Sequence, residues 1–398
     1  MFDNIPSNWQ ILAIGDIAKI YNGNSINKTV KQTKYTGLSN GRSFIATKDV
    51  AFDGTVTYEN GVKIPSSETN FKTAPADSVF VCSEGGSAGR KTAYVTQEVC
   101  FGNKLFAIVR KSELYNGKYI YYFTRSQLFF KQFQELLNGI IGGVNNKKFA
   151  SIILPVPPIE EQRRIVSRIE ELFSELDSAV ETLQKTRQQL EIYRQAVLKE
   201  AFENCKIQVR FGDIIISRLG KMLDKKKNVG VERTYLRNAN VRWFDFDLSN
   251  LLQMRITDDE IDRYSLHKGD LVICEGGEPG RCAIWKKDEM IFYQKALHRV
   301  RFKTKCKPEF YMYYMSYIAK TGTINEYFTG TGIKHLTGES LSKIPVPSTS
   351  YSQQEKITSE IELKMSVCDS IEKTVNEALQ QAEAMRQSIL KKAFEGEL

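Results

Sequence analysis

The sequence contains two copies of one unit, and this internal duplication constrains the fold more than any other feature. Four pairs of blocks recur at nearly the same offset along the sequence, which is 190, 192, 191 and 192 residues in turn: "LPVP" and "IPVP", "VCSEGG" and "ICEGG", "NKLFAIVR" from Asn103 and "QKALHRVR" from Gln294, "LKEAFE" and "LKKAFE". Chance matches would not keep an offset this constant, so the sequence predicts two copies of one fold.

Each copy begins with a globular part. Short apolar segments such as "DSVFVCSEGG", "LFAIVR", "GDLVICEGG" and "CAIWKK" are bounded by turn-forming residues and read as strands. The aromatic-rich runs "KYIYYFTRSQLFFKQFQELLN" and "PEFYMYYMSYIAKTGTINEYF" have the spacing of amphipathic helices, whose aromatic rings we expect in the core. The predicted fold class is α+β, with two tandem repeated domains of mixed sheet and short helices.

Each copy ends in a long helical part with a heptad pattern. In the first copy one seam repeats at strict sevens and a second runs beside it: Ile169, Leu176, Leu183, Leu190 and Val197; Ile165, Leu172, Ala179, Thr186 and Tyr193. The second copy has the same two seams: Ile361, Cys368, Val375, Ala382 and Ile389; Ile357, Lys364, Ile371, Ala378 and Met385. We expect the two helices to form an antiparallel coiled coil with each other, in preference to a parallel pair or to packing along their own globular parts.

A proline-rich junction precedes each helical part. Proline removes backbone donors, fixes φ and disfavours helix before it, so "LPVPP" ends a strand or loop. Glu160 and Glu161 then fall in the first helical turn, where the helix dipole favours acids. The second junction, "IPVPSTSYSQQEK", lacks the second proline of the pair and these acids, so we expect a looser start to the second helix.

Composition limits the environment and the partners. The net charge of +9 fits either a solvated basic surface or an acidic partner such as nucleic acid. Seven cysteines without a CxxC pair favour reduced thiols, and the N-terminus lacks the pattern of a signal peptide, so we expect a cytoplasmic protein. No run of eighteen apolar residues indicates a membrane span.

Catalytic motifs are missing. The glycine-rich segments do not have the spacing of a phosphate-binding loop or a dinucleotide fingerprint, and no Asn- or Asp-Pro-Pro-aromatic motif of an amino-methyltransferase occurs. Asp77 with Glu84 and Asp270 with Glu275 resemble part of a nuclease motif, but glycine stands where its lysine belongs. The three histidines do not fall at a metal-ligand spacing, so neither catalysis nor a metal is expected in this chain.

These features together resemble the specificity subunits of type I restriction–modification systems, over essentially the whole chain. The resemblance rests on four segments: "LPVPPIEEQRRIVSRI", the terminal "KKAFEGEL", the opening "IPSNWQILAIGDIAKIYNG" and "FGDIIISRLGKMLDKKKN". It implies target-recognition domains at 1–157 and 204–347, and conserved spacer helices at 158–203 and 348–398.

The resemblance also implies a role and partners. Each recognition domain would read one half of an asymmetric split site in double-stranded DNA. Two methyltransferase subunits, and in the full complex two translocase–nuclease subunits, would bind S-adenosylmethionine, ATP and Mg²⁺, while this chain carries no cofactor. Two other functions stay open, which are an endonuclease or methyltransferase with a degenerate motif and a coiled-coil scaffold without sequence preference.

Base reading calls for Arg, Lys, Asn or Gln side chains at exposed loops, supported by phosphate contacts. The candidates in the first domain are Asn24, Lys28, Lys34, Asn40, Arg42, Asn103, Lys104, Asn145, Asn146 and Lys147. Those in the second domain are Lys221, Lys225, Arg237, Asn238, Asn240, Arg242, Lys295, Lys334 and His335. We pair Asn103-Lys104 with Gln294-Lys295 as equivalent positions, and Asn145 to Lys147 with Lys334-His335.

Overall fold

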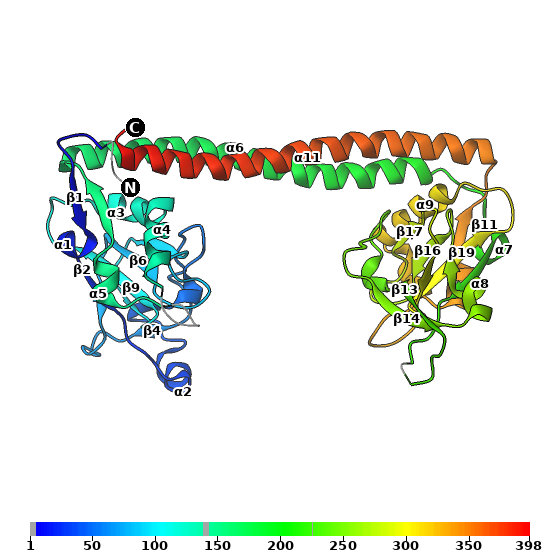
Figure 1. Cartoon of the computed structure of the whole chain (residues 1–398), viewed down its shortest axis with the longest axis horizontal. Coiled ribbons are helices and arrows are strands. Elements are labelled where there is room, and N and C mark those ends of the chain that lie inside the picture. Colours follow the sequence, from blue (N-terminus) through cyan, green and yellow to red (C-terminus); the bar gives the residue numbers. More distant parts are fainter. Residues whose placement is uncertain (1–4, 138–142, 225) are drawn as a thin grey trace. The chain divides into compact units, whose positions relative to one another are not determined.

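The computed structural model of the chain describes residues 5–137, 143–224 and 226–398, and it divides into two compact units. Unit 1 comprises residues 1–183 and 377–398, and unit 2 comprises residues 184–376. Each unit holds one globular domain and a stretch of both long helices, α6 (Ile159–Phe202) and α11 (Tyr351–Glu395) (Figure 1).

The two units contain matching series of elements. Those of unit 1 are β1 (Gln10–Ala13), α1 (Ile14–Ile17), β2 (Ala18–Asn22), α2 (Lys28–Val30), η1 (Lys31–Tyr35), β3 (Arg42–Ile45), η2 (Thr47–Asp49), β4 (Lys63–Ile64), β5 (Thr73–Ala74), β6 (Ser78–Cys82), β7 (Thr92–Val95), β8 (Val99–Phe101), β9 (Leu105–Arg110), α3 (Gly117–Thr124), α4 (Gln127–Glu135), α5 (Asn146–Ala150) and β10 (Ile153–Val156). Those of unit 2 are β11 (Gln208–Arg210), α7 (Phe211–Ile214), β12 (Ile215–Leu219), β13 (Val231–Leu236), η3 (Asn238–Asn240), β14 (Leu252–Ile256), η4 (Asp258–Glu260), α8 (Ile261–Tyr264), β15 (Ser265–Leu266), β16 (Leu271–Cys274), β17 (Cys282–Ile284), β18 (Ile291–Tyr293), β19 (Leu297–Phe302), α9 (Pro308–Lys320), η5 (Thr323–Tyr327), α10 (Gly338–Lys343) and β20 (Pro345–Pro347).

Both domains have the same sheet topology. In unit 1 the antiparallel sheet β2-β9-β6-β7 accompanies the mixed sheet β4-β3-β8-β5, in which β3 and β8 are parallel. In unit 2 the sheets β12-β19-β16-β17 and β14-β13-β18-β15 repeat this order, and β13 and β18 are parallel. The duplication inferred from the sequence is therefore confirmed strand by strand, as is the α+β class.

The central strand of each domain is buried on both faces. Val79 and Val81 of β6 face the cluster formed with helices α1, α3 and α4, whereas Phe80 and Cys82 face the cluster shared with the mixed sheet. The strand β16 alternates between the same two surroundings. A strand covered on both faces needs a continuous apolar run, which explains "VFVC" and "LVIC".

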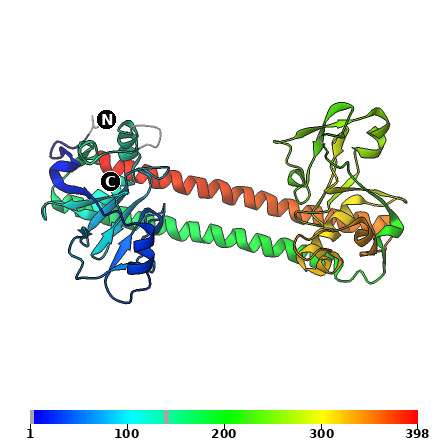
Figure 2. The same ribbon diagram turned by 90° about the horizontal axis from the view of Figure 1, so that it is seen from below.

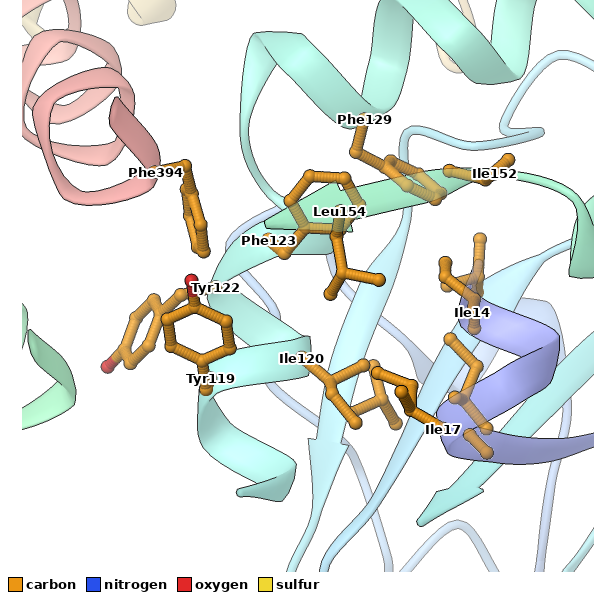
Figure 3. Close-up of a cluster of buried hydrophobic side chains, with 14 of the residues drawn as sticks. Ile14, Ile17, Tyr119, Ile120, Tyr122, Phe123, Phe129, Ile152, Leu154 and Phe394 are labelled. Atoms are coloured by element: carbon orange, nitrogen blue, oxygen red, sulfur yellow. The ribbon is translucent and has the colours of Figure 1, made fainter. Parts of the chain in front are cut away.

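The end of each long helix is buried in an aromatic cluster. Phe394 of α11 lies in unit 1 against Tyr119 and Phe123 of α3, with ring centroids 5.1 and 5.4 Å apart (Figure 3). Phe202 of α6 lies in unit 2 against Phe310 and Tyr314 of α9, at 5.3 Å from each. The repeated "AFE" is thus the anchor of a helix end, and the aromatic residues of these helices are core residues, as predicted.

The two long helices pack antiparallel within each unit (Figure 1, Figure 2). In unit 2, Arg194 pairs with Asp369 at 2.7 Å, while Glu200, later in α6, pairs with Lys364, earlier in α11, also at 2.7 Å. In unit 1, Arg386 pairs with Asp177. The predicted contact between the two helices is therefore confirmed, and the direction of the pairing in each unit is antiparallel.

The two predicted seams differ in burial. The first seam, which runs from Ile169 to Val197 in α6 and from Ile361 to Ile389 in α11, is buried or half-buried along both helices. The second seam is partly open, because Tyr193, Ile371 and Met385 are exposed. Packing of each helix on a globular domain, the disfavoured alternative, occurs at the helix ends, where Ile165 and Ile361 enter the domain cores.

A buried glutamine holds each junction. The Gln162 side chain donates to the Pro157 carbonyl at 2.8 Å and accepts from the Asn116 amide at 2.9 Å. The Gln354 side chain donates to the Thr349 carbonyl at 3.1 Å and accepts from the Lys307 amide at 2.9 Å. The expectation of a looser second junction is not supported, because the same anchor is present without the second proline.

Candidate nucleic-acid interface

Three segments converge at the same end of each domain. In unit 1, the Ser83 amide donates to the Lys104 carbonyl at 2.9 Å, and the Val144 amide donates to the Ser83 carbonyl at 3.1 Å. In unit 2, the Glu275 amide donates to the Ala296 carbonyl at 2.9 Å, and the Leu336 amide donates to the Glu275 carbonyl at 2.7 Å. A glycine-rich loop, a strand-connecting turn and a third segment are thereby joined in both copies.

These contacts correct the pairing of the strand-connecting turns. Leu105 and Leu297 begin β9 and β19, and each closes its turn with a backbone hydrogen bond, to Gly102 at 3.1 Å and to Gln294 at 3.0 Å. The offset here is 192, so Asn103 corresponds to Lys295 and Lys104 to Ala296. The sequence alignment at 191 matched two lysines that occupy different positions.

The third segment also shifts. The isolated bridges Glu84 to Gly143 and Gly276 to His335 are equivalent, so His335 corresponds to Gly143. Asn145 lies beyond this point, where its side chain caps α5 by accepting from the Lys148 amide at 2.9 Å. The predicted pairing of Asn145, Asn146 and Lys147 with Lys334 and His335 is therefore wrong, because the counterpart of His335 is Gly143, although Asn146 and Lys147 are exposed.

In unit 1 the structure brings three predicted residues together. Asn24, Asn103 and Lys104 line a hollow of about 280 Å³ beside the converging segments. The Asn24 side-chain oxygen accepts from the Lys72 amide at 2.7 Å, and the Lys104 ammonium pairs with Glu84 at 2.8 Å. Both residues are therefore oriented by local contacts, while Asn103 projects from an exposed turn.

The other predicted residues of unit 1 are spread over the segment between β2 and β3. Lys34 pairs with Glu68, whose hydrogen bond raises the pKa of Lys34. Arg42 pairs with Glu98 at 3.5 Å and donates to the Glu68 carbonyl at 3.2 Å. Lys28 and Asn40 are exposed. Lys34 and Arg42 thus fasten neighbouring segments, whereas Lys28 and Asn40 point to solvent.

In unit 2 two predicted residues are structural. Asn240 is 3% exposed, and its amide donates to the carbonyls of Asp247 and Asn250 at 2.9 and 3.1 Å. Lys221 is 6% exposed, and its ammonium pairs with Glu260. Since these polar groups are buried and satisfied inside the domain, they are not placed to reach a base edge, and the predictions for both are corrected.

The remaining residues of the "RNANVR" stretch organise the loop after β13. Arg237 donates to the Asn250 carbonyl at 2.9 Å, and Arg242 pairs with Asp247 at 3.0 Å while half of its side chain stays exposed. The Asn238 side chain donates to the Gly276 carbonyl at 3.3 Å, which ties this loop to the glycine-rich loop. Asn238 and Arg242 are therefore beside the converging segments with part of their surface open.

The other predicted residues of unit 2 surround the same place. Lys295 and Lys334 are exposed, and His335 lies 3.1 Å from a carboxylate oxygen of Glu275. The backbone amide of Lys295 donates to the Lys221 carbonyl at 2.9 Å. Lys225 lies outside the described residues.

The sequence reasoning missed two kinds of residue. Lys31 lines the hollow of unit 1, and Lys48 lies near it. In unit 2, Met222 and Val229 are 65% and 61% exposed on the loop that also carries Lys226 and Lys227. The adjacent "ML" in "GKMLDKKKN" is the sequence signal for an apolar loop tip.

The carboxylates that resembled a nuclease motif are engaged by basic groups. Asp270 accepts two hydrogen bonds from Arg301, at 2.6 and 2.8 Å, and Asp77 pairs with Arg110. Among the residues that the structure describes, no group of three or more His, Cys, Asp or Glu side chains could hold a metal ion. In the same part of the chain, no helix is long and apolar enough to cross a membrane.

Comparisons with known proteins agree with the repeat. The family model for the type I restriction modification DNA specificity domain matches twice, at residues 6–191 and 207–381. The EcoKI specificity subunit of Escherichia coli K12 is 28% identical over 353 residues, covering 82% of this chain and 76% of that protein. The EcoBI specificity subunit of Escherichia coli is 24% identical over 432 residues, covering 99% and 87%.

Solved structures share the fold. One is a chain of a type I restriction–modification system, solved to explain complex assembly and conformational transition, with a TM-score of 0.79 and 16% identity over 99% of both chains. The HsdS subunit of Thermoanaerobacter tengcongensis matches with a TM-score of 0.59 and 16% identity, covering 99% of this chain and 98% of that one. Since the family model covers most of the sequence in two successive copies, this chain belongs to the family of type I restriction–modification DNA specificity subunits.

Proposed function

We propose that this specificity subunit reads an asymmetric bipartite site in double-stranded DNA, with one half-site for each globular domain. The observation that carries the proposal is the repeated convergence of three segments, which has different side chains in the two units. Lys104 in unit 1 corresponds to Ala296 in unit 2, and Gly143 corresponds to His335. The same backbone frame with different donors and acceptors favours two different half-sites.

The proposed contact surface consists of the exposed residues around this frame. In unit 1 these are Lys28, Asn40, Asn103, Lys104, Asn146 and Lys147, with the half-buried Asn24, and in unit 2 Arg242, Lys295 and Lys334, with the half-buried Asn238 and His335. Arginine and asparagine side chains suit guanine and adenine edges, and lysines suit phosphates. The exposed Met222 and Val229 add apolar surface at the loop tip of unit 2, suited to thymine methyl groups.

The chain is a non-catalytic subunit, as specificity subunits of this family are. We infer that it assembles with two methyltransferase subunits and, in the full complex, with two restriction subunits, and that these partners bind S-adenosylmethionine, ATP and Mg²⁺. The recognition domains would span 1–157 and 204–347, and the spacer helices 158–203 and 348–398. We infer a cytoplasmic location, where the seven free cysteines would stay reduced.

The test is to express this chain with its methyltransferase subunit in a host without other such systems, and to sequence the modified bases. The expected result is methylation within one split sequence with two unlike halves. Replacing 204–347 by the corresponding domain of the EcoKI specificity subunit should change one half and leave the other.

Two outcomes would overturn the proposal. Cleavage or methyl transfer by the purified chain alone would favour a degenerate enzyme. Equal affinity of the assembled complex for all duplexes would favour a scaffold without sequence preference.

A further inference from the structure

The hollow in unit 1 has a specific construction. Its lining comes from the segment after β2, the end of β3 and the turn after β8, and it includes Asn24, Lys31, Thr47 and Asn103. Its volume of about 280 Å³ exceeds the roughly 30 Å³ share of one water molecule in the liquid several times. A phosphate group with part of its hydration therefore fits.

The electrostatics of Lys31 favour an anion. Its ammonium lies 5.2 Å from the centroid of the buried Phe44 ring. Two effects lower the pKa of Lys31: its burial, which is the larger, and repulsion from the positive charge of Lys48. Attraction from Asp49 offsets this only in part. Within the described ranges, neither Lys31 nor Lys48 has a carboxylate at ion-pair distance. Among the described residues, Lys31 therefore lines the hollow without a direct carboxylate contact.

The neighbouring groups are suited to an oxyanion. Asn103 presents an exposed amide at the rim, whereas the ammonium of Lys104 is paired with Glu84 at 2.8 Å. Neutral amide donors beside cations are a common phosphate-binding set in proteins that bind DNA.

Unit 2 does not repeat the arrangement. Lys221 occupies the position of Asn24, since its amide donates to the Tyr293 carbonyl as that of Asn24 donates to the Phe101 carbonyl, at 3.0 and 2.9 Å. Its ammonium is buried against Glu260 and is thereby neutralised. At this position, therefore, unit 2 carries a paired lysine where unit 1 has the asparagine that lines the hollow.

We propose that the hollow lined by Asn24, Lys31, Thr47 and Asn103 binds one backbone phosphate of the DNA half-site at unit 1, with Lys31 as its cationic ligand. This inference rests on the proposed function. A phosphate contact fixes the register of the domain on DNA without reading sequence, so its removal weakens binding to all duplexes alike.

The test uses the assembled methyltransferase with its cognate duplex and an unrelated duplex, titrated over a range of KCl concentrations. Lys31→Gln should reduce the slope of log affinity against log salt by about one on both duplexes and leave their affinity ratio unchanged. Lys31→Arg should keep the wild-type slope. Lys19→Gln, at an exposed lysine of β2, is the matched control and should change neither slope nor ratio.

Distinct results separate the failures. A wild-type slope for a folded Lys31→Gln complex would overturn the phosphate site, as would a fall of the affinity ratio, because that indicates a base contact. A wild-type complex that does not discriminate between the duplexes refutes the proposed function instead. Adding ATP should leave the slope difference in place, and its disappearance would assign the hollow to a nucleotide phosphate rather than to DNA.

Discussion

Gln162 and Gln354 perform the same task in the two halves of the chain. Each side chain accepts a hydrogen bond of 2.9 Å from a backbone amide, that of Asn116 for Gln162 and that of Lys307 for Gln354. Each also donates a hydrogen bond to a carbonyl at the preceding junction. Both are nearly completely buried, at 1% and 3% exposure. Each glutamine thus ties the first turn of a long helix to a loop that leads into the aromatic helix of the same domain.

Replacing Gln354 by Ala should destabilise unit 2 by about 1–3 kcal/mol, because the half-buried Lys307 amide would lose its acceptor. The neighbouring Gln353 is exposed, so Gln353→Ala is the control. Urea unfolding of both variants checks the prediction. Equal free energies of unfolding for the two variants would contradict the role of the buried glutamine.

Phe394→Ala and Phe202→Ala should each cost about 3–5 kcal/mol, since both rings are buried among aromatic side chains. The destabilisation should fall in different units, which limited proteolysis can separate. Tyr193→Ala, at an aromatic residue of α6 that is 48% exposed, should have little effect. Protease-sensitive sites confined to unit 2 in the Phe394 variant would contradict the observed docking.

The loop tip of unit 2 offers a comparison between charge and apolar surface. Replacing Lys226 and Lys227 by Gln should lower the salt slope of DNA binding by about one for each of these lysines that binds a phosphate. Met222→Ser should weaken binding without changing the slope, because an apolar side chain releases no counterions when it binds. Titrations of the assembled complex over KCl measure both effects, and a change of slope on replacing Met222 would be inconsistent with this division.

Unit 2 should lose stability in alkali. Burial raises the pKa of the Cys274 thiol from 9.0 to about 11. Above about pH 9 the unfolded chain therefore loses this proton while the folded chain keeps it, so the free energy of unfolding falls as the pH rises to about 11. Cys282 shifts in the same direction because it is also buried.

Urea unfolding at several pH values in reductant tests this dependence. Cys274→Ala should give a shallower decline than the wild type, and Cys306→Ala, at a partly exposed position, should not. Parallel declines in all three proteins would remove Cys274 as a source of the effect.

The architecture could be predicted because the motifs that specify it occur in both halves of the sequence. Five heptads, proline junctions and a nearly constant offset are patterns of order along the chain, so they indicated the two domains and the paired helices directly. The burial of the second seam was overestimated, since Tyr193 and Ile371 fit the heptad pattern but are exposed. A heptad shows that a face is apolar, but the packing partner decides how much of that face is covered.

The candidate site was less predictable because residue type does not reveal orientation. Asn240 and Lys221 are ordinary DNA-binding residue types, but the side chains of both are engaged inside the domain. Lys31 was passed over although Lys28 and Lys34 beside it were selected. Only the fold brings Lys31 near Lys48 and into the hollow with Asn103, which is 72 positions further along the chain.

The discontinuity of unit 1 has a consequence for the order in which the protein is made. Unit 2 is one uninterrupted stretch, so all of it is synthesised before the last part of unit 1. The core of unit 1 includes Leu390, Ala393 and Phe394, so the first domain to be translated is the last to be completed. A chain terminated before the final turns of α11 would have a complete second unit and an open aromatic core in the first.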